Sequence, residues 1–139
     1  MLKRILFAHD ATPAAEKVLP YLEHLARLEE AEVFVLHVYE QPERYMATQG
    51  YEPFMERLES LAQEVVDDTC DHLQKAGISV RGLVRSGDPA RAILETVREE
   101  NISLIVLASR GPSSVKDLLL GEVSTEVVRY AHCPVFLVP

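Results

Sequence analysis

A loop near the C-terminus carries the residues best suited to chemistry. Gly111 and Gly121 stand ten residues apart in the segment 108–125, between an apolar run and a helical pattern. Glycines in such a loop let backbone amides approach a phosphate, because no Cβ intervenes. The start of the following helix would add its dipole and its free amides. The same glycines could equally serve as simple turns, and both interpretations stand.

Three residues of this loop depart from what a phosphate site needs. Ala108 narrows the approach to a ligand but keeps its amide, whereas Pro112 has no N–H to donate. Glu122 places a carboxylate at the start of the last helix, where the helix dipole favours an anion. It could fill the phosphate position as a built-in cap, or it could point into solvent from the first helical turn.

Other side chains of the loop favour phosphate binding. Arg110 and Lys116 could neutralise phosphate charge, Arg110 in a bidentate manner. A loop arginine is nevertheless more often found in a surface ion pair. The hydroxyl of Ser124 could donate to a phosphate or cap the last helix.

Elements that could position this loop alternate regularly along the chain. The apolar runs of strand length are 4–10, 32–40, 79–87, 103–109 and 134–139, and the helical patterns are 14–31, 54–77, 87–100 and 124–132. Such alternation predicts an α/β fold with an open, mostly parallel sheet and helices on both faces. Ligands of these sheets bind beyond the carboxyl ends of the strands.

Residues at helix boundaries support this pattern. Thr12 and Asp88 are expected N-caps, each followed by a proline at the first helical position. Pro20 predicts a kink or a broken turn inside the first helix. The long helix is expected to bury an apolar face and to end at a glycine in the C′ position. That face comprises Phe54, Leu58, Leu61, Val65, Thr69 and Leu73, and the glycine is Gly77.

Asp10 ends the first strand, which makes it a candidate site residue. It could also cap the first helix, and the two roles are compatible. His9 and His37 lie near the ends of the first two strands without a cluster of carboxylates or thiols. We therefore expect packed, neutral histidines and no metal site. No nucleophile–base pair is recognisable, so we expect no catalytic residues and no enzyme.

Composition limits the class of protein. The 139 residues suit a single domain, and the net charge of −8 argues against a nucleic-acid partner and raises the cost of holding ATP. No apolar run is long enough to span a membrane, and no cleavable leader is recognisable, so we expect a cytoplasmic protein. Cys70 and Cys133 lack metal or redox spacing.

Several segments together resemble the universal stress protein family over essentially the whole chain, 1–139. They are RILFAHDATPAAEKVLPYLEHLA, VFVLHVYE, VRSGDPARAILETVREENISLIVLASRG and LLLGEVSTEVVRYAHCPVFLVP. The dinucleotide fingerprint G-x-G-x-x-G after the first strand and the P-loop motif are both missing, which excludes those two nucleotide folds.

The resemblance implies a site for an adenine nucleotide. The family's binding members carry a Gly, two residues, a Gly, nine residues, and then Gly-Ser or Gly-Thr; here two of the three glycines remain and Glu122 replaces the hydroxyl residue. By the same resemblance Asp10 lies near adenine and ribose, Val38 against adenine, and Ser124 near phosphate. The complete set of predicted binding residues is Asp10, Val38, Ala108, Arg110, Gly111, Gly121, Glu122, Val123 and Ser124.

Two functions of different classes follow. The first is a stress-response protein that binds ATP, ADP or AMP, with Mg²⁺ accompanying the nucleotide. The second is a dimeric interaction module that has lost nucleotide binding and acts through an unknown protein partner. Whether Glu122 and Pro112 still allow a phosphate to bind discriminates between these two functions. For the first function, the sequence favours a mono- or diphosphate over ATP. The resemblance also implies an adenine-nucleotide-hydrolase-like strand order 3-2-1-4-5 and a homodimer formed through the C-terminal strand 134–139.

Overall fold

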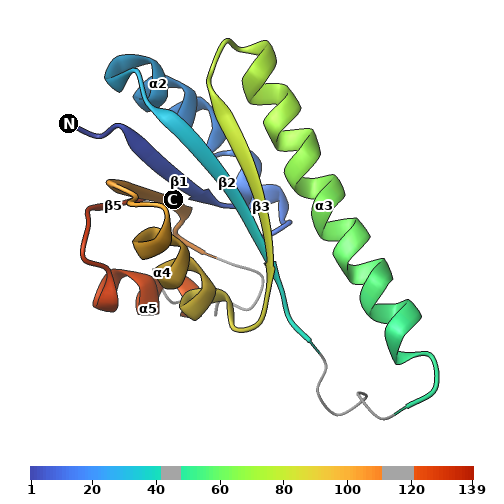
Figure 1. Ribbon diagram of the computed structural model, residues 1–139. Helices are drawn as coiled ribbons and strands as arrows, with labels where there is room; N and C mark the ends of the chain where they lie inside the picture. Colours follow the sequence, from blue (N-terminus) through green and yellow to red (C-terminus); the bar gives the residue numbers. More distant parts are fainter. Residues whose placement is uncertain (42–47, 111–120) are drawn as a thin grey trace.

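A five-stranded parallel sheet forms the centre of the computed structural model, which describes residues 1–41, 48–110 and 121–139. The strands are β1 (Arg4–Ala8), β2 (Glu32–Tyr39), β3 (Val80–Ser86), β4 (Leu104–Ala108) and β5 (Val135–Val138). They lie in the order β3-β2-β1-β4-β5, and every neighbouring pair is parallel (Figure 1). The expected strand order is therefore confirmed.

Helices cover both faces of the sheet. The helices are α1 (Pro13–Glu16), α2 (Leu19–Glu29), α3 (Tyr51–Lys75), α4 (Pro89–Glu99) and α5 (Glu122–Tyr130). Among the described residues, no helix is both long and apolar enough to cross a membrane.

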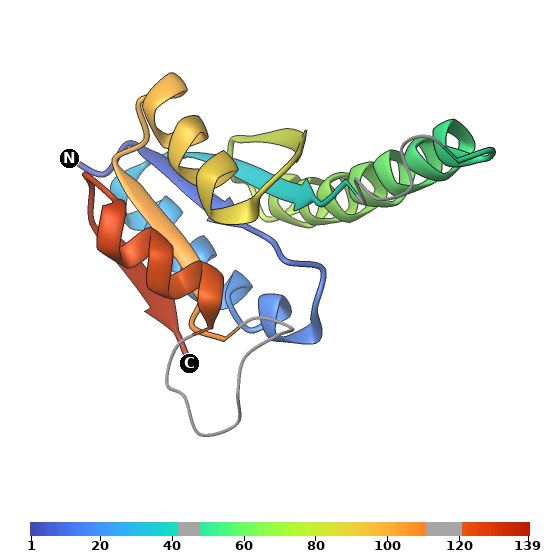
Figure 2. The same cartoon turned by 90° about the horizontal axis from the view of Figure 1, so that it is seen from below.

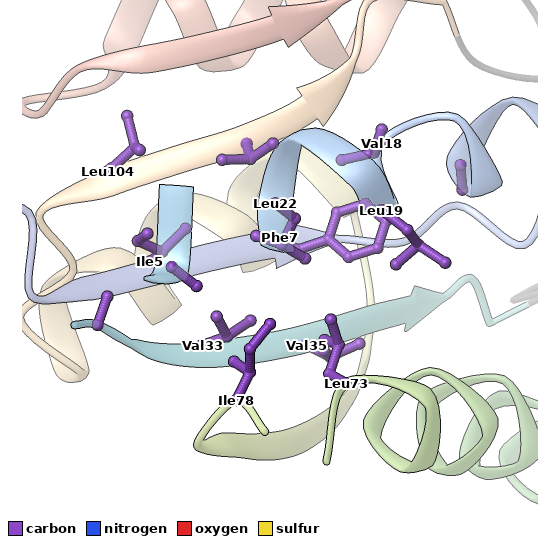
Figure 3. Close-up of a cluster of buried hydrophobic side chains, with 14 of the residues drawn as sticks. Ile5, Phe7, Val18, Leu19, Leu22, Val33, Val35, Leu73, Ile78 and Leu104 are labelled. Carbon is purple, nitrogen blue, oxygen red and sulfur yellow. The ribbon is translucent and has the colours of Figure 1, made fainter. Parts of the chain in front are cut away.

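Alternation of side chains along β1 divides the core into two clusters. Ile5 and Phe7 pack against α1, α2 and α3, in a cluster that includes Leu22 and Leu73 (Figure 3). Leu6, between them in sequence, belongs to the second cluster with residues of α4 and α5. Because the inner strands β1, β2 and β4 are buried on both faces and need apolar residues at nearly every position, their runs in the sequence are nearly continuous, whereas the edge strand β3 includes Arg81 and Arg85.

Prolines lie at the start of α1, α2 and α4. The first helical pattern is divided into α1 and α2, and Pro20 lies in the first turn of α2, as the broken turn expected there requires. Asp88 caps α4 by accepting a hydrogen bond from the Arg91 amide over 3.0 Å. Thr12 occupies the N-cap position of α1, but its hydroxyl makes no cap hydrogen bond with that helix.

The long helix α3 differs from its expected packing. It buries Ala62, Val66, Thr69 and Leu73, whereas Phe54 is 47% exposed and Leu61 41% exposed. The reason is visible in Figures 1 and 2, where the N-terminal half of α3 projects beyond the end of β3 and has no sheet to cover it. Gly77, with φ of +83°, follows the C-cap as expected.

Close contact between α3 and β3 leads to a first prediction, at Gly82. A Cβ at this position would lie 2.5 Å from Val66 Cγ1 and 3.1 Å from Cys70 Sγ. Gly82→Ala is therefore expected to lower the free energy of unfolding by about 1 kcal/mol or somewhat more, measured by urea denaturation. Adding Val66→Ala should relieve the overlap, so the double variant should lose less free energy of unfolding than the two single variants lose together. A double variant that loses more than this sum would contradict this account.

Candidate functional site

A pocket of about 200 Å³ opens at the carboxyl ends of β1, β2 and β4. The first residues of α4 and α5 complete its wall, so segments far apart in sequence meet there. In the strand order, β1 and β4 are neighbours from which the chain continues in opposite directions, which is where ligands of open α/β sheets bind.

Most of the predicted binding residues lie together at this pocket. Those on its wall are Asp10, Val38, Ala108, Glu122, Val123 and Ser124. Gly121 is the buried N-cap of α5, and Arg110 is exposed and does not belong to the wall. Gly111, like Pro112 and Lys116, lies outside the described residues.

Asp10 is held in a tight turn. Its Oδ1 accepts hydrogen bonds from the Thr12 amide (3.0 Å) and the Thr12 hydroxyl (2.5 Å). Within the described part of the chain, its Oδ2 accepts none. The turn thus fixes one carboxylate oxygen and leaves the other available to a ligand, which makes the two expected roles of Asp10 compatible.

Backbone amides without helical acceptors gather at the start of α5. The first hydrogen bond within this helix runs from the Thr125 amide to the Gly121 carbonyl, over 3.0 Å. The amides of Glu122, Val123 and Ser124 therefore remain as donors at the pocket, with no acceptor among the described residues. Such donors together with the helix dipole suit an anionic group.

Glu122 lies at the rim of the pocket as the first residue of α5. Its side chain is exposed, and in the described chain its carboxylate takes part in no hydrogen bond or ion pair. The geometry therefore favours the interpretation in which Glu122 faces solvent over the one in which it caps its own helix.

Ser124 uses its hydroxyl inside the protein. The side chain is 4% exposed, and Oγ donates to the carbonyl of Ala108 over 2.9 Å. This bond ties α5 to the end of β4, so the hydroxyl proton predicted to contact phosphate is already engaged. The backbone amide of Ser124 is the donor that remains.

Apolar residues that the sequence reasoning did not assign to the site form much of its wall. They include Leu36 and Leu107 from the strands and Pro89 and Ile93 from α4. The signal for the latter pair was the GDPA-x-x-I block, residues 87–93, which a resemblance to the family singles out but periodicity assigns only to a helix.

Apart from the ionisable side chains of His9 and His37, the charges on the described wall are all negative. Asp10, Glu40 and Glu122 contribute carboxylates, and the described part of the wall includes no lysine or arginine. The wall thus combines an apolar surface, acidic side chains and the amide donors of α5.

Two histidines lie at the ends of β1 and β2. His9 is 7% exposed, and its Nδ1 accepts a hydrogen bond from the Ala11 amide over 2.9 Å. Burial lowers the pKa of His9 below its ordinary value, partly offset by the Glu16 carboxylate. His37 donates from Nδ1 to the His9 carbonyl over 2.6 Å. Among the described residues, no group of three His, Cys, Asp or Glu could hold a metal ion.

Comparisons with known proteins match the whole chain. The model of the universal stress protein family covers residues 1–139. A relative from Thermus aquaticus, named as a universal stress protein in the QAH/OAS sulfhydrylase 3′ region, is 32% identical over 139 residues and covers 99% of each chain.

Solved structures with the same fold include the protein MJ0577 of Methanocaldococcus jannaschii. Its TM-score is 0.90 at 25% identity, over 99% of this chain and 96% of that one. A universal stress protein family protein from Arabidopsis thaliana, solved with AMP bound, has a TM-score of 0.72 at 19% identity, over 98% and 90% of the two chains. At that identity the likeness shows the fold alone.

Proposed function

The chain belongs to the universal stress protein family, and from this premise we propose that it is a stress-response protein whose pocket binds an adenine nucleotide. The observation that carries the proposal is a convergence across one apolar pocket. Asp10, whose Oδ2 accepts no hydrogen bond from the described residues, lines this pocket together with the amide donors at the start of α5.

Each part of a nucleotide has suitable chemistry available in the pocket. Val38, Leu36 and Ile93 offer apolar surface to a base. The Asp10 carboxylate can accept from ribose hydroxyls, and the start of α5 can donate to a phosphate. The bound AMP of the Arabidopsis relative agrees with this choice of ligand class.

The number of phosphates follows from size and charge. The pocket volume of about 200 Å³ is below the roughly 300–1,000 Å³ typical of drug-sized ligands, which suits a base, a sugar and one phosphate at the α5 amides, with any further phosphates outside. The carboxylate of Glu122 at the rim disfavours a long polyphosphate. We therefore rank AMP and ADP above ATP, with Mg²⁺ accompanying the nucleotide rather than held by the protein.

Binding rather than catalysis is the proposed activity. The Ser124 hydroxyl donates to a backbone carbonyl, and His9 Nδ1 is occupied by the Ala11 amide, so neither is arranged as a nucleophile with its base. Conversion of the nucleotide at a rate typical of enzymes would contradict this part of the proposal.

Calorimetric titration of the purified protein with AMP, ADP and ATP, with and without Mg²⁺, tests the proposal. We expect micromolar binding in the order AMP and ADP before ATP. If none of the three ligands gives a heat of binding, the proposal is overturned. That result would favour the second candidate, a dimeric interaction module that acts through a protein partner.

We further propose a homodimer formed along β5. In the described chain β5 pairs only with β4, and the carbonyls of Pro134 and Val138 accept from β4 residues or their neighbours. The backbone groups of Val135 and Leu137 therefore face the open edge. Light scattering should give twice the 15.6 kDa mass of one chain.

Leu137→Pro is expected to halve that mass, because proline removes an outward N–H from the edge. Circular dichroism of the variant should show an intact fold. A monomeric wild type, or a variant that stays dimeric, would contradict pairing through this edge.

A further inference from the structure

We propose that His9 is a positioning residue: its Nδ1 holds the turn that aims Asp10 at the pocket, and its protonation releases that turn. The inference rests on the proposed nucleotide site and names a means of regulating it. It stands on hydrogen-bond geometry between residues 9 and 12.

The turn consists of a continuous series of hydrogen bonds. The Ala11 amide donates to His9 Nδ1 (2.9 Å), and the Thr12 amide and hydroxyl then donate to Asp10 Oδ1. The Thr12 carbonyl next accepts from the Ala15 amide at the start of α1, over 3.1 Å. Asp10 is thus fixed between the end of β1 and the first helix.

The backbone conformation of Ala11 costs free energy. Its φ is +63°, the left-handed region that residues with a Cβ adopt at a cost. The bond to His9 Nδ1 compensates for that cost and satisfies the Ala11 amide. Losing this acceptor would free Ala11 to relax and would displace Asp10, its neighbour in the chain.

The position of the proton on His9 follows from the same bond. Because Nδ1 accepts from an N–H, it carries no proton, so neutral His9 is protonated at Nε2. Nε2 lies 3.7 Å from Glu16 Oε1 of α1. A second proton must go to Nδ1, where it would oppose the Ala11 N–H donor to donor.

His9 is fixed from its other sides. Its ring packs against Phe7 at 5.4 Å between centroids, and its carbonyl accepts from His37 Nδ1 of β2. Within the described ranges, the ionisable groups that face it are Glu16 from α1, Asp10 at the end of β1 and His37 from β2. The imidazole therefore cannot rotate away from the turn without breaking packing on β1.

The direction of the pH effect follows from burial. Because burial keeps the pKa of His9 below its ordinary value, the acceptor is present at neutral pH and is lost as pH falls through that lowered pKa. Nucleotide affinity is therefore expected to decrease on acidification. The loss should be about fivefold, as for one hydrogen bond.

Two variants separate this role from simple packing. In His9→Asn, the side-chain oxygen stands the same number of bonds from the backbone as Nδ1, accepts from Ala11 and does not titrate. In His9→Leu, the bulk is retained but the acceptor is lost. We titrate wild type and both variants with AMP at pH 7.5 and at a pH below the midpoint of His9, which NMR of the free protein supplies, so the ionisation of AMP itself is common to all three.

The expected result is a wild-type affinity that falls about fivefold more on acidification than that of His9→Asn. His9→Leu should bind weakly at both pH values. Parallel pH profiles for wild type and His9→Asn, or full affinity in His9→Leu, would overturn the inference.

A measurement on the free protein distinguishes failure of the inference about His9 from failure of the proposed nucleotide binding. In ¹⁵N NMR of the free protein, the His9 ring nitrogens and the amides of Ala11 and Thr12 should titrate together in the wild type. The same two amides should not move with that midpoint in His9→Asn. Independent midpoints in the wild type would overturn the inference even if no nucleotide binds.

Discussion

Replacing Asp10 by asparagine is expected to weaken AMP binding by about 10–100-fold, because a charge-assisted hydrogen bond is lost. The asparagine side chain can still accept from Thr12 through its oxygen, so the turn survives. The amide nitrogen then replaces Oδ2, the oxygen that accepts no hydrogen bond from the described residues. A neutral donor would thus replace the charged acceptor of the ribose hydroxyls, and only a weaker, uncharged hydrogen bond to a hydroxyl oxygen could form.

Titration calorimetry with two ligands isolates this contact. AMP should bind far more weakly to Asp10→Asn than to wild type, whereas an AMP analogue lacking both ribose hydroxyls should bind the two proteins equally. Glu40→Gln is the matched control, since Glu40 is an exposed carboxylate on the same pocket wall. Because AMP is an anion, removing the Glu40 charge should leave its affinity unchanged or raise it slightly. An equal loss in that control would mean that the loss in Asp10→Asn does not come from a contact with ribose.

Much of the fold could be predicted from the sequence because it depends on local signals. The apolar runs give the strands directly, since a parallel sheet covered on both faces needs apolar residues throughout. Pro20 and Asp88 define helix boundaries through steric and hydrogen-bonding properties of their own. The buried face of α3 could not be predicted in this way. Phe54 and Leu61 fit the periodicity, but how far β3 extends decides which turns are covered.

The candidate site could be predicted only in outline. A strand end and a family resemblance place Asp10 and Val38 at the pocket, where the structure has them. The hydrogen bond from Ser124 to Ala108 joins residues 16 positions apart, so no local pattern reveals that the hydroxyl is engaged. The left-handed conformation of Ala11 depends likewise on a histidine whose role the sequence alone does not show.

These differences change which groups would hold a phosphate. The family pattern emphasises a hydroxyl after the last glycine, but here the amides of Glu122, Val123 and Ser124 are the donors left at the start of α5. Backbone amides tolerate a change of side chain. The glutamate in place of a hydroxyl residue therefore affects the charge at the rim more than it affects the supply of donors.

Reversing that charge should alter the choice between nucleotides. Glu122→Lys is expected to tighten ATP binding by about tenfold or more, because it removes a repulsive carboxylate at the rim and supplies a cation to the outer phosphates. The gain for AMP should be smaller, since its single phosphate is expected at the amides of α5 and not beyond them. The ATP-to-AMP affinity ratio, measured by calorimetry in 0.15 M salt, is therefore the decisive quantity.

Glu126→Lys provides the control for overall charge. Glu126 lies one turn further along α5, is exposed and does not line the pocket, so its replacement changes the net charge equally. Charge felt at long range is screened over about 8 Å at this ionic strength, and Glu126→Lys should leave the ratio nearly unchanged. If both variants shift the ratio alike, the acidic protein as a whole disfavours ATP. If neither does, the outer phosphates lie away from Glu122, and the preference for AMP and ADP must come from the size of the pocket.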